Sequence, residues 1–362
     1  MIEIPFLIIG GGPAGLSAAL IATELGIGTV LLDDGLMLGG QLTKQTHKFF
    51  GSKMESAGTR GFVIGKQMVE ELARRKNFTA YLNTTAAGLY EDGVLTAVQN
   101  EKVWLKFKPQ CLLIATGASE KMVAFPGNDL PGVYGAGAVQ TLMNVYSVMP
   151  GKRILMIGAG NIGLIVSYQL MQAGAGVAAI VEAMDKIGGY WVHASKIRRL
   201  GVPILTRYTV LKAIGEEQVA GAVIAKVDDM WKPIAGTEVE IEVDTICLAV
   251  GLSPTLDILF QAGVQMKYVP ELGGDVPIRD KFMRTSNRSI YVAGDAAGIE
   301  EASSAMLEGQ IAGLSAAKSL RASIPDYNNR MNIMKNELES LRAGPLSEKV
   351  KLGLEKVRIN WA

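Results

Sequence analysis

Cysteine and histidine are scarce in this sequence, and their scarcity excludes several kinds of redox and metal site. The 362 residues include only two cysteines and two histidines, His47 and His193. No C-x-x-C sequence occurs, so neither a redox dithiol nor a cysteine-ligated iron–sulfur cluster is expected. Two histidines are also too few for a multi-histidine site, and we expect no bound metal.

The two cysteines, Cys111 and Cys247, each fall within a short apolar run, residues 111–114 and 246–248. A thiol in apolar surroundings is unreactive, so both are predicted to be inert residues of the core. A disulfide between them is disfavoured in a reducing compartment.

The chain also lacks an excess of charge and a long unbroken apolar segment. Its 36 basic and 35 acidic residues leave a net charge of +1, which favours neither nucleic acid nor an anionic membrane as a partner. The apolar run of residues 4–22 is broken by the glycines of 10–15, so it fits neither a signal peptide nor a membrane span. The protein is therefore expected in the cytoplasm.

Glycine, by contrast, is abundant, as expected for a chain with many strand-to-helix turns. The pattern G-x-G-x-x-G occurs twice, at residues 10–15 and 158–163. Each copy follows an apolar run, opens a predicted helix and has an acidic residue, Asp33 or Glu182, about 20 positions on. This is the dinucleotide-binding fingerprint, and two copies on one chain are typical of a redox enzyme that passes electrons between two cofactors.

The spacing of the fingerprint has physical reasons that hold in both copies. The first glycine makes the tight turn, the second lets the backbone approach a pyrophosphate, and the third lets the helix and strand pack closely. The helix N-terminus offers unbonded N–H groups and positive dipole charge to the phosphate. The acidic residue accepts hydrogen bonds from ribose hydroxyls. A glycine-rich turn without a ligand is the alternative for each copy.

The chain repeats one plan after each fingerprint, which predicts an α/β fold of two three-layer Rossmann-like domains. An antiparallel meander is expected near residues 79–108 and 204–242, each followed by an apolar strand ending in a turn, at 112–117 and 247–251. A further buried strand at 285–295 and a helix at 302–320 would return to the first sheet. The second domain, 120–252, is then inserted into a first domain of residues 1–119 plus 253–325.

Residues 326–362 form a predicted helical extension at the C-terminus. Met331, Met334, Leu338 and Leu341 recur at intervals of three and four, and Gly344-Pro345 would stop that helix. The apolar stripe fits either packing on its own domain or a contact with another subunit.

These motifs resemble the two-dinucleotide-binding-domain flavoproteins of the pyridine nucleotide–disulfide oxidoreductase superfamily, and most of all its short thioredoxin-reductase-like members. Besides the fingerprints, the resemblance rests on residues 39–42, 115–117 and 249–254 and on Gly294-Asp295. It covers about residues 4–322 and implies FAD in the first domain and a nicotinamide nucleotide, NAD(H), in the second.

The resemblance also implies which residues hold FAD. The glycine turn would hold the pyrophosphate, Asp33 or its neighbour Asp34 the adenosine ribose, the Ala86 backbone the adenine and Asp295 the ribityl chain. The helix beginning near Ser303 would point its positive end at the flavin. The full set is Gly10, Gly12, Pro13, Ala14, Gly15, Asp33, Asp34, Gly40, Gln41, Ala86, Ala115, Thr116, Gly117, Gly294, Asp295, Ser304 and Ala305.

In the second domain Glu182 is expected to select the nucleotide. A carboxylate repels a 2′-phosphate but accepts hydrogen bonds from a free 2′-hydroxyl, and no arginine follows it closely, so NAD(H) is predicted over NADP(H). The corresponding set is Gly158, Gly160, Asn161, Ile162, Gly163, Glu182, Ala249 and Gly251.

The chain departs from thioredoxin reductases in lacking their dithiol, so disulfide reduction is not expected. Residues 39–50 and 298–305 resemble a subgroup that includes subunits of heteromeric amino-acid, opine and sarcosine dehydrogenases. Several of those relatives carry a cysteine-rich segment that this chain lacks. A homodimer or a hetero-oligomer is expected by analogy.

Three functions follow from these observations. The first is a flavoprotein that moves a hydride between NAD(H) and the flavin and exchanges electrons with a small-molecule or protein acceptor or donor. The second is the electron-transfer subunit of a dehydrogenase whose partner subunit oxidises an organic substrate. The third is a non-catalytic scaffold that binds adenine nucleotides. Lys44 and His47 are candidates for tuning the flavin or for proton delivery, although a solvated or structurally satisfied side chain is the favoured interpretation of each.

Overall fold

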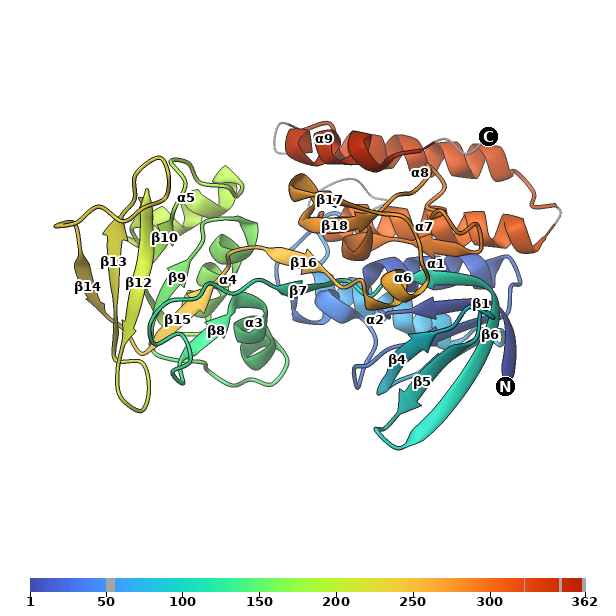
Figure 1. Ribbon diagram of the computed structural model, residues 1–362, viewed down its shortest axis with the longest axis horizontal. Coiled ribbons are helices and arrows are strands. Elements are labelled where there is room, and N and C mark those ends of the chain that lie inside the picture. The colour runs from blue at the N-terminus through green and yellow to red at the C-terminus, as the bar shows by residue number, and fades with distance from the viewer. Residues whose placement is uncertain (50–55, 322, 345–346, 360–362) are drawn as a thin grey trace. The chain divides into compact units, whose positions relative to one another are not determined.

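The two fingerprints lie in separate units of the chain (Figure 1). The structure, a computed structural model, describes residues 1–49, 56–321, 323–344 and 347–359. One unit comprises Met1–Ser119 and Ser253–Ala362, and the other comprises Glu120–Leu252. Among the described residues, no helix is both long and apolar enough to cross a membrane.

The first unit is built on a seven-stranded sheet. The strands β3 (Phe78–Tyr81), β2 (Thr29–Leu32), β1 (Ile2–Ile9) and β6 (Val103–Ile114) run parallel in that order, and β19 (Ile290–Val292) pairs with β6 in parallel. Two antiparallel strands, β5 (Leu95–Gln99) and β4 (Thr84–Leu89), extend the sheet from β6. The late strand β19 thus returns to the first sheet, as the sequence predicted.

Strand β1 is buried on both of its faces, which explains its continuous apolar sequence. Phe6 and Ile8 lie in the core beneath the helices, whereas Leu7 and Ile9 lie in the core on the opposite side. This alternation follows from the two-residue period of a strand that is covered by other elements on both sides.

The predicted meander at 79–108 and the predicted strand at 112–117 are wrong in their boundaries. Residues 78–81 form the parallel strand β3, and the last meander strand continues without a break into the central strand β6. Pro109 lies between the part of β6 paired to β5 and the part paired to β19. Fewer hydrogen bonds between neighbouring strands are required at this position. The amide hydrogen that proline lacks therefore does not end the strand.

The strand predicted at 285–295 is shorter in the structure. Only Ile290–Val292 pair in the sheet. The preceding residues form a turn, in which the amide of Asn287 donates to Thr285 Oγ1 and the amide of Ile290 donates to the carbonyl of Asn287. These local bonds occupy the backbone groups that a strand would need.

Helices cover the first sheet. They are α1 (Pro13–Glu24), α2 (Gly61–Ala73), the short 3₁₀ helix η1 (Gly40–Lys44) and α7 (Ala302–Leu320), the last as predicted. Glycines of α7 face α1 closely: a Cβ at Gly309 would lie 2.1 Å from the carbonyl oxygen of Ala14, and one at Gly313 would lie 2.6 Å from that of Ala18. The two helices therefore pack with almost no side chain between them.

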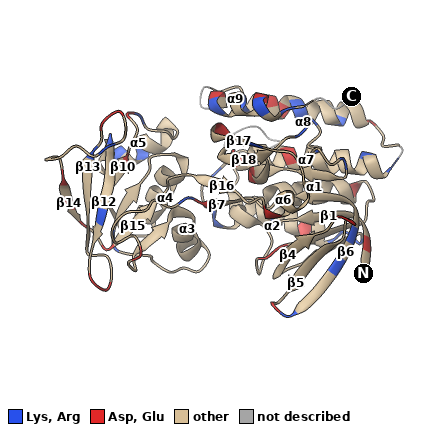
Figure 2. Cartoon of the chain, in the orientation of Figure 1, with Lys and Arg blue, Asp and Glu red and all other residues tan. Residues whose placement is uncertain are grey.

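The C-terminal extension packs on the first unit. Helix α8 (Tyr327–Leu341) buries Met331, Met334 and Leu338 in the core shared with α1 and α7, so the stripe seen in the sequence serves its own unit. Helix α9 (Glu348–Val357) packs on β17 (Met266–Val269), η2 (Pro270–Leu272) and β18 (Gly274–Pro277). The predicted stop at Pro345 lies outside the described residues. Both basic and acidic residues lie along α9 (Figure 2).

The second unit repeats the plan with a separate meander. Its parallel sheet has the order β11 (Ile204–Thr206), β10 (Gly176–Glu182), β9 (Arg153–Ile157), β15 (Thr245–Leu248) and β8 (Val133–Gly135). The helices are α3 (Ala136–Asn144), α4 (Asn161–Gln172) and α5 (Trp191–Arg199), and the meander consists of β12 (Tyr208–Ile214), β13 (Gly221–Lys226) and β14 (Val239–Glu242). The meander begins later than predicted, because residues 204–206 join the parallel sheet.

The three layers of the second unit enclose two cores. Ile154 and Met156 of β9 lie in the core on the helix side, and Leu155 and Ile157 lie in the core on the meander side. Both units therefore have parallel Rossmann-like sheets, and the predicted α/β fold class is confirmed.

Two short strands, β7 (Ala118–Glu120) and β16 (Leu252–Pro254), form a two-stranded sheet where the chain passes between the units. On the side of the first unit, Thr116 Oγ1 donates to the carbonyl of Thr255 at 2.7 Å. The two crossings of the chain thus run side by side. The remaining short helix of this segment is α6 (Asp257–Gln261).

Candidate dinucleotide sites

The first fingerprint forms a turn in which two glycines are required by the fold and one is not. Gly10 has a φ of +102°, and a Cβ there would lie 2.2 Å from the carbonyl oxygen of Ala115. A Cβ at Gly15 would lie 1.9 Å from the carbonyl oxygen of Gly10, whereas one at Gly12 would meet no protein atom within 4 Å. The middle glycine therefore borders open space at the start of α1, where a phosphate group could approach the backbone.

An acidic side chain lies at the edge of this turn. Asp33 follows β2, and its Oδ2 accepts a hydrogen bond from the amide of Gly11 at 2.6 Å while its Oδ1 accepts one from Gly35 at 2.8 Å. Burial raises the pKa of the Asp33 carboxyl, and these two amides oppose that rise. The neighbouring Asp34 is exposed, so it is the carboxylate of Asp33 that faces the fingerprint.

The second fingerprint repeats these features. A Cβ at Gly158 would lie 2.3 Å from the carbonyl oxygen of Ala249, one at Gly163 would lie 2.0 Å from that of Gly158, and one at Gly160 would meet nothing within 4 Å. Glu182 Oε2 accepts a hydrogen bond from the amide of Ala159 at 2.8 Å. The internal duplication thus extends to single hydrogen bonds.

The turns that follow the central strands β6 and β15 lie against the two fingerprints. The amide of Ala115 donates to the carbonyl of Ile9 at 2.8 Å. The amide of Ala249 donates to the carbonyl of Ile157 at 2.7 Å. Gly117 and Gly251, two residues further on in each turn, have positive φ angles of +73° and +118°. Ala115 and Thr116 therefore lie directly beside the first fingerprint, and Ala249 lies beside the second.

A pair of adjacent glycines contacts each fingerprint, and the pair at 188–189 was not among the residues predicted from the sequence. The amide of Gly39 donates to the carbonyl of Gly11 at 2.8 Å, and the amide of Gly189 donates to that of Ala159 at 3.0 Å. A Gly-Gly pair follows the acidic residue at the same distance in both halves, at 39–40 and 188–189. That repeat was the available signal.

The turn at Gly294 reaches the same fingerprint from the other end of the chain. It forms the 3₁₀ helix η3 (Gly294–Ala297), and a Cβ at Gly294 would lie 3.0 Å from that of Ala14 and 3.5 Å from that of Ala305. Ser304 and Ala305 are buried in the first turn of α7. Residues almost 300 positions apart in the chain are thereby assembled around one helix N-terminus.

The carboxyl of Asp295 in this turn has a strongly shifted pKa. Loss of solvent raises the pKa of Asp295 to about 7, the negative charges of Glu308, Glu300 and Glu301 act in the same direction, and a hydrogen bond from the amide of Glu300 opposes them. The carboxyl can therefore carry a proton near neutral pH, and it can donate as well as accept a hydrogen bond.

Two other predicted residues occupy the neighbourhood of the first fingerprint. Ala86 lies in β4, two residues after Thr84, whose amide donates to the carbonyl of Asp33 at 2.9 Å. Gln41 is exposed in η1, directly after Gly40. A Cβ at Gly40 would lie 2.7 Å from the Cα of Gly12, so this loop is in van der Waals contact with the fingerprint turn.

Lys44 and His47 are half-buried after η1. The ring of His47 stacks on Phe49, with centroids 5.9 Å apart. Phe50, the last residue of the motif that begins at Gly39, lies outside the described residues. The stacking gives His47 a structural role, and the proton-delivery role of both residues stays a prediction.

The thiols are buried, as the sequence predicted. Cys111 lies in β6, and burial raises its pKa to about 11. Cys247 lies in β15, where burial and the charge of Glu120 also raise its pKa. Both sulfur atoms are therefore protonated and unreactive at neutral pH.

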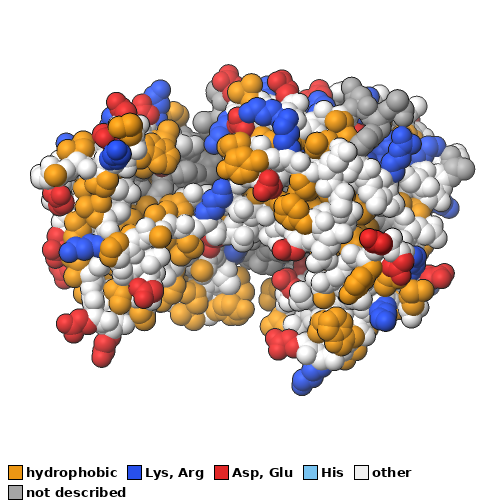
Figure 3. Space-filling view, in the orientation of Figure 1, with side chains coloured by type: hydrophobic (Ala, Val, Ile, Leu, Met, Phe, Trp, Pro, Cys, Tyr) orange, Lys and Arg blue, Asp and Glu red, His pale blue; other side chains and the backbone are white. Residues whose placement is uncertain are grey.

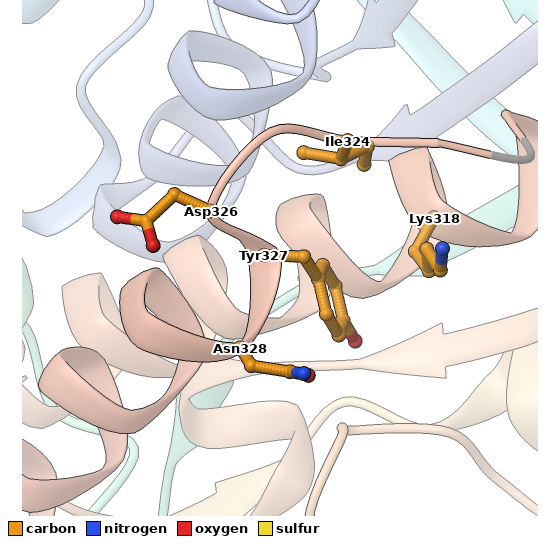
Figure 4. Close-up of a pocket in the computed structure, with 5 residues that line it drawn as sticks. All are labelled: Lys318, Ile324, Asp326, Tyr327 and Asn328. Carbon is orange, nitrogen blue, oxygen red and sulfur yellow. The ribbon is translucent and has the colours of Figure 1, made fainter.

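One surface pocket of the first unit lies apart from these residues. It is lined by Lys318, Ile324, Asp326, Tyr327 and Asn328 where α7 gives way to α8 (Figure 4). Lys318 Nζ lies 5.6 Å from the ring centroid of Tyr327. None of these five residues belongs to a fingerprint, and the pocket is not a candidate for either nucleotide.

Two Rossmann-like units, each with an open glycine turn and a carboxylate at its rim, define a flavoprotein oxidoreductase with FAD- and NAD(P)-binding folds. The chain belongs to the pyridine nucleotide-disulphide oxidoreductase family, which matches residues 5–309. The resemblance recognised in the sequence is thereby confirmed, and membership of the family implies FAD and a nicotinamide nucleotide as cofactors.

Curated relatives are components of larger enzymes. The chain is 28% identical to the alpha subunit of sarcosine oxidase from Rhizobium meliloti over 71% of its length, and 25% identical to one of the opine oxidase subunits of Agrobacterium tumefaciens over 87%. It spans only 25% and 65% of those proteins. It is also 27% identical to the HcnB subunit of hydrogen cyanide synthase from Pseudomonas aeruginosa, over 85% of this chain and 70% of that one.

Solved structures share the fold. The thioredoxin reductase of T. acidophilum matches with a TM-score of 0.72 and 22% identity, over 88% of this chain and 99% of that one. The L-proline dehydrogenase of P. horikoshii matches with a TM-score of 0.70 and 23% identity, over 94% and 59%. Both matches support the two-domain architecture.

Proposed function

We propose that the chain is an FAD-dependent oxidoreductase that moves a hydride between NAD(H) and the flavin and exchanges electrons with an acceptor or donor other than a disulfide. The observation that carries the proposal is the duplicated turn. In each unit a glycine that borders open space begins a helix, and a carboxylate held by backbone amides stands beside it. A chain with two such turns can bind two dinucleotides.

FAD fits the first unit. Gly12 leaves room for the pyrophosphate at the N-terminus of α1, where the unbonded amides and the helix dipole favour negative charge. The free lone pairs of Asp33 would accept hydrogen bonds from the adenosine ribose, and Asp295 would bond the ribityl chain. The N-terminus of α7 would place positive dipole charge near the flavin. When bound, FAD supplies the hydride and electron chemistry.

NAD(H) fits the second unit. Gly160 leaves the corresponding room at the start of α4, and Glu182 stands at the rim with its carboxylate fixed by two amides. A 2′-phosphate would meet the negative charge of this side chain, whereas a free hydroxyl could donate to it. The residues that follow, Ala183, Met184 and Asp185, offer no cation for a phosphate. We therefore propose NAD(H) as the physiological nucleotide.

The proposed acceptor or donor is not a disulfide. The chain has no C-x-x-C, and its two thiols are buried and protonated. Electrons would have to leave the flavin for another organic molecule or for a protein.

A second candidate function is favoured by the relatives. Three of them are named as subunits of sarcosine oxidase, opine oxidase and hydrogen cyanide synthase. In this alternative a partner subunit oxidises the organic substrate and passes electrons to this chain. Exposed apolar side chains are interspersed with polar and charged ones over the face in Figure 3, so the partner surface is not marked by one large apolar area there.

The visible spectrum of the purified protein tests these functions. It should be recorded without oxygen before and after NADH, with NADPH as the comparison. Rapid bleaching of a flavin band by NADH supports the proposed hydride transfer. A flavin band that NADH leaves unchanged contradicts it, and favours a chain that receives electrons from a partner or acts as a nucleotide-binding scaffold.

A further inference from the structure

Four charged side chains form a buried cluster in the first unit that neither fingerprint requires. This ionic cluster consists of Arg279, Glu300, Glu308 and Arg342, whose side chains are 2–8% exposed. Arg342 donates to both carboxylate oxygens of Glu300, at 2.8 and 2.5 Å, and to Glu308 Oε1 at 2.7 Å. Arg279 also contacts Glu308 Oε1, at 3.3 Å.

The cluster is bonded directly to the turn that carries Asp295. Glu308 Oε2, the oxygen that neither arginine uses, accepts a hydrogen bond from the amide of Gly294 at 3.0 Å. Arg279 Nη1 donates to the carbonyl of Ala297 at the end of the same turn, at 2.5 Å. The amide of Glu300 lies 3.5 Å from Asp295 Oδ1. The turn is thus held at its beginning, its end and its acidic side chain.

Arg342 reaches this site from the C-terminal extension. It directly follows α8, a helix that lies beyond the residues that the family matches, 5–309. The extension also forms hydrogen bonds with the backbone of Arg279. The amide of Arg279 donates to the carbonyl of Val357, and the amide of Ile359 donates to the carbonyl of Arg279. The extension therefore contacts the turn indirectly at two places, through Glu300 and Glu308 at Arg342 and through Arg279 at residues 357–359.

The charges of the cluster balance only when Arg342 is present. Two arginines face two glutamates, and Asp295 adds a third carboxyl beside them. Burial alone would lower the pKa of Arg342, but Glu300 and Glu308 raise it above its ordinary value, so the guanidinium stays charged. Without it, two buried carboxylates next to Asp295 would share a single cation.

We propose that Arg342 is a positioning residue for FAD, which holds Glu300 and Glu308 so that the Gly294–Asp295 turn keeps the shape and charge that the ribityl chain requires. The inference rests on the proposed FAD site in the first unit. It makes the C-terminal extension part of the flavin site, although no residue of the extension belongs to either fingerprint.

The test compares FAD binding to apoprotein of the wild type, Arg342→Met and Arg342→Lys. Loss of the guanidinium should raise the FAD dissociation constant at least tenfold, and lysine, which cannot make the fork-shaped contact, should restore only part of the affinity. Arg330→Met is the matched control, because Arg330 lies on the same helix and pairs with Glu24 at the surface. It should bind FAD as the wild type does.

A second readout separates positioning from mere stability. The Asp295 carboxyl faces Glu300, Glu301 and Glu308, and the two arginines offset that charge. The pH midpoint of FAD binding should therefore move upward in Arg342→Met and downward in Glu300→Gln. The double variant Glu300→Gln/Arg342→Met removes both partners of one contact, so it should fold even if Arg342→Met alone does not.

The outcomes are distinct. Equal FAD affinity and equal pH midpoints in Arg342→Met and Arg330→Met overturn the inference while leaving FAD in the first unit. A wild-type protein that binds no FAD overturns the proposed function itself. Weakened binding together with opposite shifts of the two pH midpoints supports the role of Arg342.

Discussion

The carboxylate of Glu182 accepts a hydrogen bond from the amide of Ala159, 2.8 Å away, and a second from the amide of Met184 at 3.0 Å. These two bonds fix an acidic side chain at the rim of the second glycine turn. The same relationship joins Asp33 to Gly11 in the first unit. The effect of a substitution in one unit can therefore be compared with that of the corresponding substitution in the other unit.

Replacing Glu182 should change the choice of nucleotide. Glu182→Arg removes the charge that repels a 2′-phosphate and adds one that attracts it, so the preference for NADH over NADPH should fall at least tenfold, or about 1.4 kcal/mol. The measurement is the rate of flavin reduction by each nucleotide. Asp185→Asn, which removes one negative charge at an exposed neighbouring site, should leave the ratio unchanged. An unaltered ratio in Glu182→Arg would show that this side chain does not contact the ribose.

Valine at the two open glycines should separate the two nucleotides. Because a Cβ at Gly12 or Gly160 meets no protein atom within 4 Å, both variants should fold with nearly wild-type thermal stability. Gly12→Val should be purified without flavin, whereas Gly160→Val should be yellow but not bleached by NADH. Gly15→Ala is the contrasting variant, since its Cβ would lie 1.9 Å from a carbonyl oxygen, and it should fail to fold. Retention of FAD by Gly12→Val would contradict the assigned site.

The Asp295 carboxyl should make the FAD-free protein less stable as the pH rises. Its pKa is about 7 in the folded chain against 3.8 as the ordinary value, so the native state holds a proton that the unfolded state releases. The protonated Asp295 carboxyl contributes fully to the free energy of unfolding below pH 4. This contribution falls between pH 4 and 7 and is absent at higher pH. Its upper bound is about 4 kcal/mol.

Asp295→Asn removes this titration. Urea unfolding of FAD-free protein at several pH values between 4 and 8 should show the wild type losing stability relative to the variant as the pH rises. The titrating carboxyl lies beside Glu300, Glu301 and Glu308, which are present in both proteins. Parallel stability curves for the two proteins would mean that Asp295 is already ionised at low pH.

The cysteines should be dispensable for electron transfer. Cys111 and Cys247 are buried, with pKa values raised by burial, so a thiol reagent should modify them only after unfolding. The Cys111→Ala/Cys247→Ala variant should be reduced by NADH at the wild-type rate, measured by stopped-flow absorbance. Loss of reduction in a folded, flavin-bound double variant would restore a redox role for these thiols.

Much of each nucleotide turn could be predicted because its determinants are local. Gly10, Gly12 and Gly15 lie within six residues, and the strand before them and the helix after them follow from short-range apolar patterns. Asp33 could be recognised because the length of the intervening helix fixes where the next strand ends. The pairing of β19 with the first sheet was predictable from its apolar composition and the connection rules of such folds.

The boundaries of the meanders could not be predicted in the same way. Whether residues 78–81 or 204–206 pair in parallel or antiparallel depends on which strand lies beside them, and not on their own composition. The continuous strand β6 carries Pro109 in its middle, which the sequence alone marks as a break. The strands that pair with β6 determine that it continues through Pro109.

The sequence by itself determined the two glycine turns, their acidic partners and the absence of a dithiol, because each is a matter of residue type and short spacing. Only the tertiary structure decided that Arg342 enters the site of Gly294 and Asp295, through Glu300 and Glu308. A buried ion pair carries no periodicity and no fixed spacing along the chain. It forms where folding removes opposite charges from water together, and that place is set by the packing of α8 on α7 and α1.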